Sequence, residues 1–228
     1  MLSNSNTLNR IKISFAHFAR TVLPEKAPKQ VLGIDTTQPT IRFLLLSHQH
    51  QQYRVQHHAA ITPTPDDRSP MITKMLQQWL NAAYITTATP TVMALTQHDI
   101  IKKTIPVAKK LNQQDIEKIV ATNIERYLSC SLSDIYLDFA PIGPSANNSQ
   151  LFDIQLIAAR RQLVDPILQP IQRAGLTVKV VDVDSYALAR AKLFLDQQKN
   201  ALKNWQKILT SEESLVLGLA LRGFAICI

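Results

Sequence analysis

Residues 31–46 read VLGIDTTQPTIRFLLL, two apolar runs separated by a polar stretch that contains a proline. Short apolar runs bounded by turn-forming residues are typical of buried strands. The next run, residues 53–61, is more polar and follows a connection rich in Gln and His. We therefore expect a sheet in which residues 31–34 and 41–46 are buried strands, with residues 53–61 as a hairpin partner at the edge.

Helical and extended patterns alternate beyond this segment. After the proline-rich loop 62–70, the spacing predicts a helix over 70–82 and a buried strand over 91–95. Residues 177–183 predict another strand, and residues 211–222 a final helix that stops at Gly223. This mixed order indicates an α/β or α+β architecture. A long helix over 185–209 is expected to bury the face made of Leu188, Ala191, Leu195, Leu202 and Trp205.

Residues 97–175 read as a β-rich insert with the order strand, helix, strand, strand, helix. After a strand over 101–105, Asn112 is expected to cap a helix that runs to about Leu128. A strand over 135–139 is expected to turn at residues 141–144 and to pair with residues 152–158. Asp165 is expected to cap the last helix, which Gly175 ends.

Composition excludes several classes of protein. The chain of 228 residues is 46 % hydrophobic, which is enough to bury a sizeable core, and no stretch reaches the ~18 apolar residues of a membrane span. Two cysteines, Cys130 and Cys227, exclude a disulfide framework and a cysteine-based zinc site. The histidines within 48–58 have no neighbouring carboxylate or cysteine, so we predict no metal site. No catalytic arrangement of Ser, His, Asp or Cys stands out.

The first 29 residues form a basic amphipathic segment. Residues 1–34 carry five basic residues against Glu25 alone, half of the net charge of +8. Such a segment can lie on an anionic membrane surface through residues 8–22, and the alternative is a tail that docks on its own domain or frays. The other basic residues are scattered without interleaved aromatic residues, so we expect no specific nucleic-acid binding. Apolar residues recur at helical spacing, at Leu8, Ile11, Phe15, Phe18 and Val22.

An ordered series of stretches resembles one family. They are Val31–Asp35 with Ile41-Arg42, Ile101–Pro106, Gln114–Glu117, Glu125–Tyr127, Ile135–Phe139, Ala158–Arg161, Ala174–Leu176, Val180–Asp184, Ala187–Arg190 and Leu217–Phe224. The series resembles the type IV pilus assembly protein PilM, an actin-like family related to FtsA, over residues 30–190 and 212–224. The resemblance implies an actin-like, ribonuclease-H-like subdomain over 30–96 and 176–228, with a small partner-binding insert over 97–175.

This chain departs from the family at the first phosphate loop, which falls on Asp35, Thr36 and Thr37 with Arg42 in the next strand. The family has Asp-x-Gly there, because only a residue without Cβ lets backbone N–H groups close around a phosphate. Here the third position is Thr37, Pro39 removes a donor, and no Asp-x-Gly occurs in the chain. We therefore interpret the loop as vestigial, with ATP and Mg²⁺ binding lost and Asp35 starting a turn.

The family's second lobe has no room in this sequence. Only about 20 residues separate the helix after Asp184 from the last helix, too few for a lobe by usual domain sizes. We therefore expect one lobe with an apolar face that favours a homodimer or is covered by the helix over 185–209.

The resemblance implies a non-catalytic scaffold, cytoplasmic and peripheral to the bacterial inner membrane. In the family, the groove between core and insert takes the N-terminal tail of the membrane protein PilN, and other pilus platform proteins are further candidate partners. Ile105, Pro106, Leu128 and Arg160 lie on elements suited to line that groove, although the apolar ones suit the core of the insert equally well. Whether the machine makes pili, secretes proteins or serves competence stays open.

Three other interpretations remain open. An actin-like ATP-binding switch predicts measurable binding of Mg-ATP. A basic DNA-associated competence protein predicts binding that weakens steeply as salt rises. A partly folded remnant predicts a broad, non-cooperative unfolding transition.

Overall fold

The expected hairpin forms the antiparallel half of a five-stranded sheet. The structure is a computed structural model that describes residues 28–63, 70–198 and 213–224. Strands β1 (Gln30–Asp35), β2 (Ile41–Gln49) and β3 (Gln52–Ile61) follow one another, and β3 lies at the edge. His50 and Gln51 make the tight turn between β2 and β3 with φ angles of 49° and 61°.

Strands β4 (Pro90–Leu95) and β8 (Thr177–Val183) complete this sheet in the order β3-β2-β1-β4-β8. β1, β4 and β8 run parallel to one another. Ile41, Phe43 and Leu45 of β2 pack into one hydrophobic cluster, whereas Leu44 and Leu46 pack into a second cluster on the opposite face. Burial on both faces explains why residues 41–46 are nearly all apolar instead of alternating.

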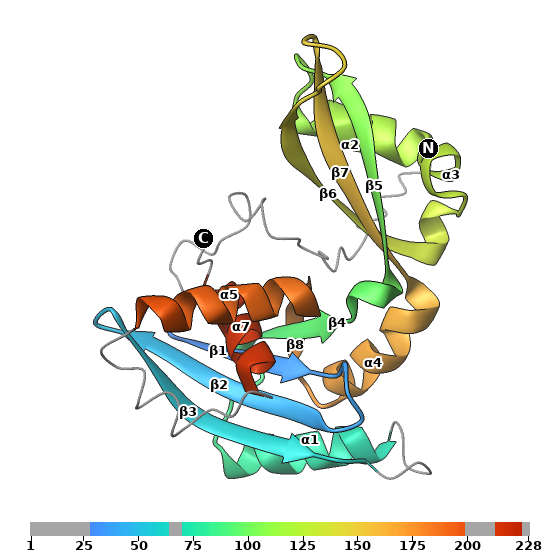
Figure 1. The fold of residues 1–228 in the computed structure, drawn as a ribbon. Helices are drawn as coiled ribbons and strands as arrows, with labels where there is room; N and C mark the ends of the chain where they lie inside the picture. The colour runs from blue at the N-terminus through green and yellow to red at the C-terminus, as the bar shows by residue number, and fades with distance from the viewer. Residues whose placement is uncertain (1–27, 64–69, 199–212, 225–228) are drawn as a thin grey trace, which may run out of the picture.

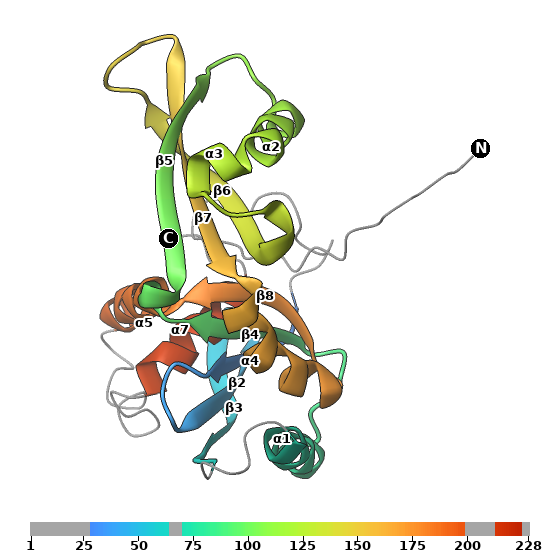
Figure 2. The ribbon, with the colours of Figure 1, turned by 90° about the vertical axis from the view of Figure 1, so that its right-hand side faces the viewer.

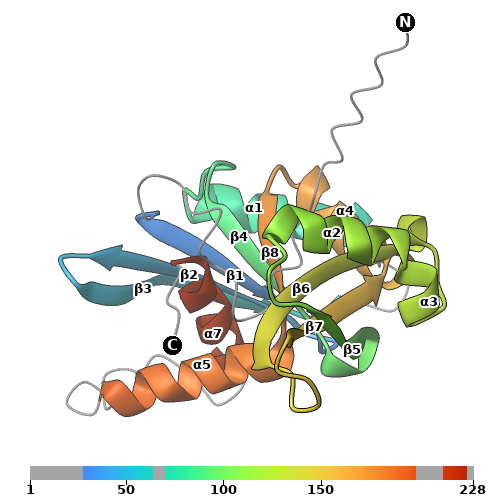
Figure 3. The same cartoon turned by 90° about the horizontal axis from the view of Figure 1, so that it is seen from above.

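Helices cover both faces of the sheet (Figures 1 and 3). α1 (Pro70–Ala82) and α4 (Arg161–Arg173) pack on one face, and α5 (Asp184–Gln197) and α7 (Ser214–Gly223) pack on the other. The mixed α/β class is confirmed. We expected residues 97–175, and α4 with them, to form the insert, but α4 packs against α1 and β8 and its buried side chains join their cluster.

The insert between β4 and α4 is a three-stranded antiparallel sheet of β5 (Ile100–Ala108), β6 (Ile135–Pro144) and β7 (Leu151–Arg160), in the order β5-β7-β6. α2 (Gln113–Thr122) and α3 (Ile124–Leu128) pack on one face of it (Figure 2). Short 3₁₀ turns, η1 (Gln97–Asp99) and η2 (Leu132–Asp134), precede β5 and β6.

Two expectations within the insert were wrong. Asn112 caps α2 by accepting a hydrogen bond from the Asp115 N–H, but the helix breaks at Asn123, whose side chain donates to the Ile119 carbonyl at 2.8 Å. Asn123 leaves helical geometry with a φ of −111° and a ψ of 13° and serves as the C-cap of α2. β6 does not turn at Pro141 but continues to Pro144, because an edge strand tolerates prolines that donate no hydrogen bond.

The helix after β7 also begins differently from expectation. α4 begins at Arg161, so Asp165 lies inside its first turns and does not cap it. Its end is as expected, because Gly175 adopts a φ of +93° and its N–H donates to the Gln172 carbonyl at 2.9 Å. The Leu176 N–H donates to the Ile171 carbonyl at 3.3 Å, which completes a Schellman motif.

The buried face of α5 and the end of α7 differ from the expectations. α5 buries Ala187, Arg190, Ala191 and Phe194, whereas Leu188 is 44 % exposed. Gly223 is the last residue of α7 and does not end it through a left-handed turn. The remaining expectations, for residues 1–27, the start of the final helix at 211–212 and the positions of Leu202 and Trp205, lie outside the described residues. Among the described helices, none has the length and apolar content needed to cross a membrane.

Candidate functional site

The insert is tied to the five-stranded sheet where β4 and β8 end. Thr96 caps η1 by accepting a hydrogen bond from the His98 N–H at 3.2 Å. The Gln97 N–H donates to Asp184 Oδ1 at 3.0 Å, and the Ser185 N–H donates to the same oxygen at 2.6 Å. Asp184 therefore joins the first turn of α5 to the beginning of the insert.

Tyr136 of β6 makes a second tie, to α4. Its hydroxyl donates to Asp165 Oδ1 at 2.7 Å, and the guanidinium of Arg161 lies 4.1 Å from the centre of its ring. Burial first, and then the hydrogen bond to Asp165, raise the pKa of Tyr136 to about 12. These contacts fix a strand of the insert against a helix of the core.

The face of the insert sheet that carries no helix meets α5. Lys102 Nζ of β5 lies 4.7 Å from the ring centre of Tyr186 in the first turn of α5. Successive side chains of a strand alternate between faces, so Thr104 and Pro106 share the face of Lys102, and all three residues are exposed.

The exposed stripe of α5 continues this surface away from the insert. At about 100° per residue, Ala189 and Leu193 lie within roughly 60° of Tyr186 on the helix. Leu193 is 44 % exposed, and Ala189 is exposed as well. We call the six residues Lys102, Thr104, Pro106, Tyr186, Ala189 and Leu193 the junction face. The 3-4 spacing of residues 186, 189 and 193 was visible in the sequence, but its contact with β5 was not.

The structure does not gather the four residues considered for partner binding on one surface. Pro106 alone belongs to the junction face. Ile105 is 3 % exposed within the insert core, and Leu128 packs against that core. Arg160 is exposed at the end of β7, where strand alternation places it on the side of α2 and α3.

The loop after β1 is closed by its own side chains. Asp35 is 1 % exposed, and its Oδ1 accepts hydrogen bonds from the Thr37 N–H at 2.9 Å and the Thr37 hydroxyl at 2.7 Å. Asp35 Oδ2 lies 4.0 Å from Arg42 Nη1, and the Thr36 hydroxyl donates to the Ala94 carbonyl at 3.3 Å. The geometry is that of an Asx turn, so the Thr37 N–H that would face an anion is already bonded.

Three of the five glycines allow close packing around α7. A Cβ at Gly33, Gly218 or Gly223 would collide with a neighbouring element. The groups in the way are the Val216 carbonyl at Gly33, the Ala187 carbonyl at Gly218 and the Val31 side chain at Gly223. These glycines therefore bring α7 close to β1 and α5, and none of them lies in a loop shaped for phosphate.

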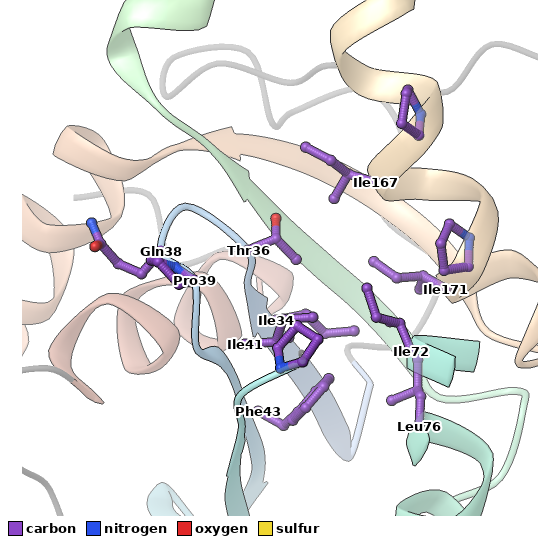
Figure 4. Close-up of a pocket in the computed structure, with 13 residues that line it drawn as sticks. Ile34, Thr36, Gln38, Pro39, Ile41, Phe43, Ile72, Leu76, Ile167 and Ile171 are labelled. Atoms are coloured by element: carbon purple, nitrogen blue, oxygen red, sulfur yellow. The ribbon is translucent and has the colours of Figure 1, made fainter. Parts of the chain in front are cut away.

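An apolar pocket of about 550 Å³ lies beside the closed loop, between α1 and α4 (Figure 4). Only Thr36 and Gln38 among its lining residues carry polar side chains, and none carries a charge. Most of its wall consists of aliphatic and aromatic groups, among them Ile34, Phe43, Ile72, Leu76, Ile167 and Ile171. This lining suits an apolar group and offers no partner for a phosphate or a metal ion.

The histidines make local contacts. The His48 ring stacks on Tyr53 with centres 4.2 Å apart, and His58 Nδ1 lies 2.8 Å from Glu213 Oε1. Within residues 28–63, 70–198 and 213–224, no group of three His, Cys, Asp or Glu side chains is placed to hold a metal ion.

Comparison with known proteins decides the family. Residues 33–209 match the family described as type IV pilus assembly protein PilM. This chain belongs to the PilM family. The family inferred from the ordered stretches is thereby confirmed, and the match extends from Gly33 within β1 through β8 and α5, including the whole insert.

Solved structures show the PilM fold. A chain of a PilM-PilN type IV pilus biogenesis complex matches with a TM-score of 0.58 and 22 % identity, covering 76 % of this chain and 53 % of that chain. The present chain thus spans about half the length of that PilM-type relative. Apart from the three-stranded sheet of the insert, the described residues contain a single sheet, which has five strands, and this agrees with the partial coverage.

Two more distant structures also match. The cytoplasmic domain of EpsL, an inner membrane component of the type II secretion system of Vibrio cholerae, matches with a TM-score of 0.45 and 14 % identity, covering 69 % of this chain and 58 % of that chain. The T. thermophilus RuvC structure in complex with a Holliday junction substrate matches with a TM-score of 0.40 and 13 % identity, covering 87 % and 95 %.

Proposed function

We propose that this chain is a non-catalytic adaptor of the type IV pilus assembly platform, at the cytoplasmic side of the inner membrane, and that it holds the N-terminal tail of a PilN-like protein on the junction face. The family match over residues 33–209 is the observation that carries this proposal. The fold it shares with a chain from a PilM-PilN complex supports the choice of partner.

The junction face is chemically suited to an extended peptide. β5 is an edge strand, so its outer edge offers backbone groups to which a peptide can add as a further strand. Exposed Pro106 and Leu193 supply apolar contacts, and Lys102 supplies a positive charge for an acidic group of the tail. The ties at Asp184, which joins η1 to α5, and at Tyr136, which joins β6 to α4, fix the insert against the core before the peptide arrives, which lowers the entropic cost of binding.

Independence from nucleotide belongs to the same proposal. The Thr37 N–H is bonded to one oxygen of Asp35, and the other oxygen of Asp35 lies near Arg42. The glycines around α7 pack against neighbouring elements. We therefore expect millimolar Mg-ATP to leave the thermal midpoint of unfolding unchanged. A saturable rise of the midpoint would favour the ATP-switch interpretation, since a ligand that binds only the folded state raises its stability.

The direct test is fluorescence anisotropy of a labelled PilN-type N-terminal peptide, with a scrambled peptide as control. Leu193→Glu should weaken binding by roughly 10-fold or more, because burying a leucine contributes about 1.5–3 kcal/mol. Leu188→Glu is the matched control, since Leu188 is also 44 % exposed on α5 but lies about 140° around the helix. Equal loss in both variants, or no saturable binding by the folded chain, would contradict the proposal.

The DNA-associated interpretation predicts a different result. A DNA duplex should then bind the chain with an affinity that falls steeply between about 50 and 200 mM salt, because each phosphate contact releases counterions. The peptide titration and a duplex titration at two salt concentrations therefore separate the two functions on the same protein sample.

A further inference from the structure

The apolar pocket between α1 and α4 leaves core side chains partly uncovered. Ile72 and Ile167 pack against the main hydrophobic cluster yet remain only partly buried, and both line the pocket. The side chains of Thr36 and Gln38 supply its only polar groups, and the Thr36 hydroxyl is already bonded to the Ala94 carbonyl. An occupant must therefore bring apolar groups and has no charged residue to pair with in the lining.

The chain itself carries an apolar stripe of matching chemistry. Leu8, Ile11, Phe15, Phe18 and Val22 recur at alternating intervals of three and four residues, which is one face of a helix. These residues precede the described part of the chain. The basic residues Arg10, Lys12 and Arg20 fall between them, so a helix that buried the stripe would keep its charges in solvent.

Size and reach both fit. A cavity of about 150 Å³ holds one benzene ring, so 550 Å³ admits several side chains such as those of Phe15 and Phe18. The pocket begins at Ile34, six residues along the chain from Pro28, where the described chain starts. β1 is buried on both faces, so the chain has to return around the outside of the domain. Residues 22–28 extend to about 20 Å, and a helical segment from Phe15 to Val22 adds about 10 Å, which gives Phe15 a reach of about 30 Å from Pro28.

We propose that the apolar stripe of residues 8–22 docks into the pocket between α1 and α4 of the same chain. This contact is separate from the junction face and does not rest on the proposed partner. It would cover the part of the core that the described residues leave open, and it would keep the basic amphipathic segment away from membrane surfaces.

Disulfide trapping in the full chain tests the contact. In a Cys130→Ser, Cys227→Ser background, Ile167→Cys is combined with either Phe15→Cys on the stripe or His17→Cys on the opposite face of the same helical pattern. If the segment is only tethered to the domain and does not dock, the two cysteines of the segment reach Ile167→Cys at the same effective concentration. We expect the Phe15→Cys pair to form an intramolecular disulfide at least about fivefold faster than the His17→Cys pair.

Filling the pocket gives an independent readout. Ile167→Trp should expel the segment and raise the rate of trypsin cleavage after Arg10, Lys12 and Arg20 by roughly tenfold, as expected for the loss of one buried apolar contact. Leu163→Trp, on the exposed surface of the same helix and outside the pocket, should leave the rate unchanged. Thermal unfolding of each variant checks that the fold is intact.

Four results would overturn the proposal. Equal disulfide rates for the two faces, or cleavage that Ile167→Trp does not accelerate, would show that the pocket does not hold the stripe. Disulfides found only between two chains would assign the pocket to the segment of a second copy. Protection from trypsin that appears only with vesicles of anionic lipid would assign the stripe to a membrane surface. None of these results bears on peptide binding at the junction face.

Discussion

Asp182 and Arg190 form a buried ion pair in which Arg190 Nη1 lies 2.8 Å from Asp182 Oδ2. The same nitrogen donates to the Gly218 carbonyl at 3.0 Å, so one guanidinium connects β8, α5 and α7. Removing one partner leaves an uncompensated charge out of water, and we expect Asp182→Ala to lower the free energy of unfolding by about 3–5 kcal/mol. Urea unfolding measures this, and Lys179→Ala, at an exposed position of the same strand, should change it by less than about 0.5 kcal/mol.

Tyr136 predicts a pH dependence at the alkaline end. Its pKa is about 12 in the folded chain, against an ordinary value of 10.0. A group whose pKa is raised on folding contributes stability that is complete below the unfolded pKa and is lost as pH rises towards the folded value. We expect one phenolate to appear near pH 12 in an absorbance titration, later than exposed tyrosines, and Tyr136→Phe to remove it. A Tyr136 that titrated near pH 10 would contradict the tie to Asp165.

Asp35 was predictable from its neighbours in sequence, whereas the burial of Arg190 was not. Asp35 was interpreted as the start of a turn because Thr37 replaces the family's glycine, and its bonds to Thr37 have that local form. Arg190 was not expected in the core, because an arginine is normally read as a surface residue. Its partner, Asp182, comes from the preceding strand, and Arg190 lies on the buried face of α5 whereas Leu188 lies on the exposed side.

α7 depends on the absence of side chains at its points of contact. Alanine favours a helix by about 1 kcal/mol over glycine, so propensity alone predicts that Gly218→Ala would stabilise α7. A Cβ there would collide with the backbone carbonyl of Ala187, which cannot move as a flexible side chain would. We therefore expect a net loss of about 1–3 kcal/mol in the free energy of unfolding. A raised thermal midpoint for Gly218→Ala would contradict the close packing of α5 and α7.

Elements were predictable where their signal was local. The apolar runs 31–34 and 41–46, the edge character of β3, the bounds of α1 and the glycine at the end of α4 follow from neighbours in sequence. The break of the helix at Asn123 and the continuation of β6 through Pro141 do not follow from neighbours in sequence. The break is a change of backbone conformation at the single residue Asn123. The course of β6 depends on its place at the edge of the sheet, which only the assembled sheet decides.

The molecule as a whole is expected to unfold as one unit. Tyr136, Ile157 and Ala159 of the insert belong to the same hydrophobic cluster as Leu32 and Ile34 of the central strand. Because the two parts share buried surface, loss of one exposes apolar groups of the other. Urea unfolding followed by far-UV circular dichroism and by amide exchange in β7 and β4 should give coincident transitions.

Separate or broad transitions would favour the partly folded remnant. The family was predictable because the order of short stretches survives in the sequence. The junction face was not predictable, because it requires β5 and α5, some 80 residues apart, to meet at Lys102 and Tyr186.

A homodimer stays a prediction, which light scattering of the full chain will test.

The pairing of β5 with β7 has a mechanical consequence. The two strands are antiparallel neighbours over nine residue pairs, from Ile100 opposite Ala159 to Ala108 opposite Leu151, and both extend between the core and the far end of the insert (Figure 2). Both strands continue into the core at their inner ends, so a pull on the outer end of one strand, directed along its length, would be carried by its own backbone. A sideways pull at the same end would open the hydrogen bonds between the strands one after another. The insert should therefore resist force along its long axis and yield to force across it, so a tethered partner would be held firmly from one direction and released easily from another.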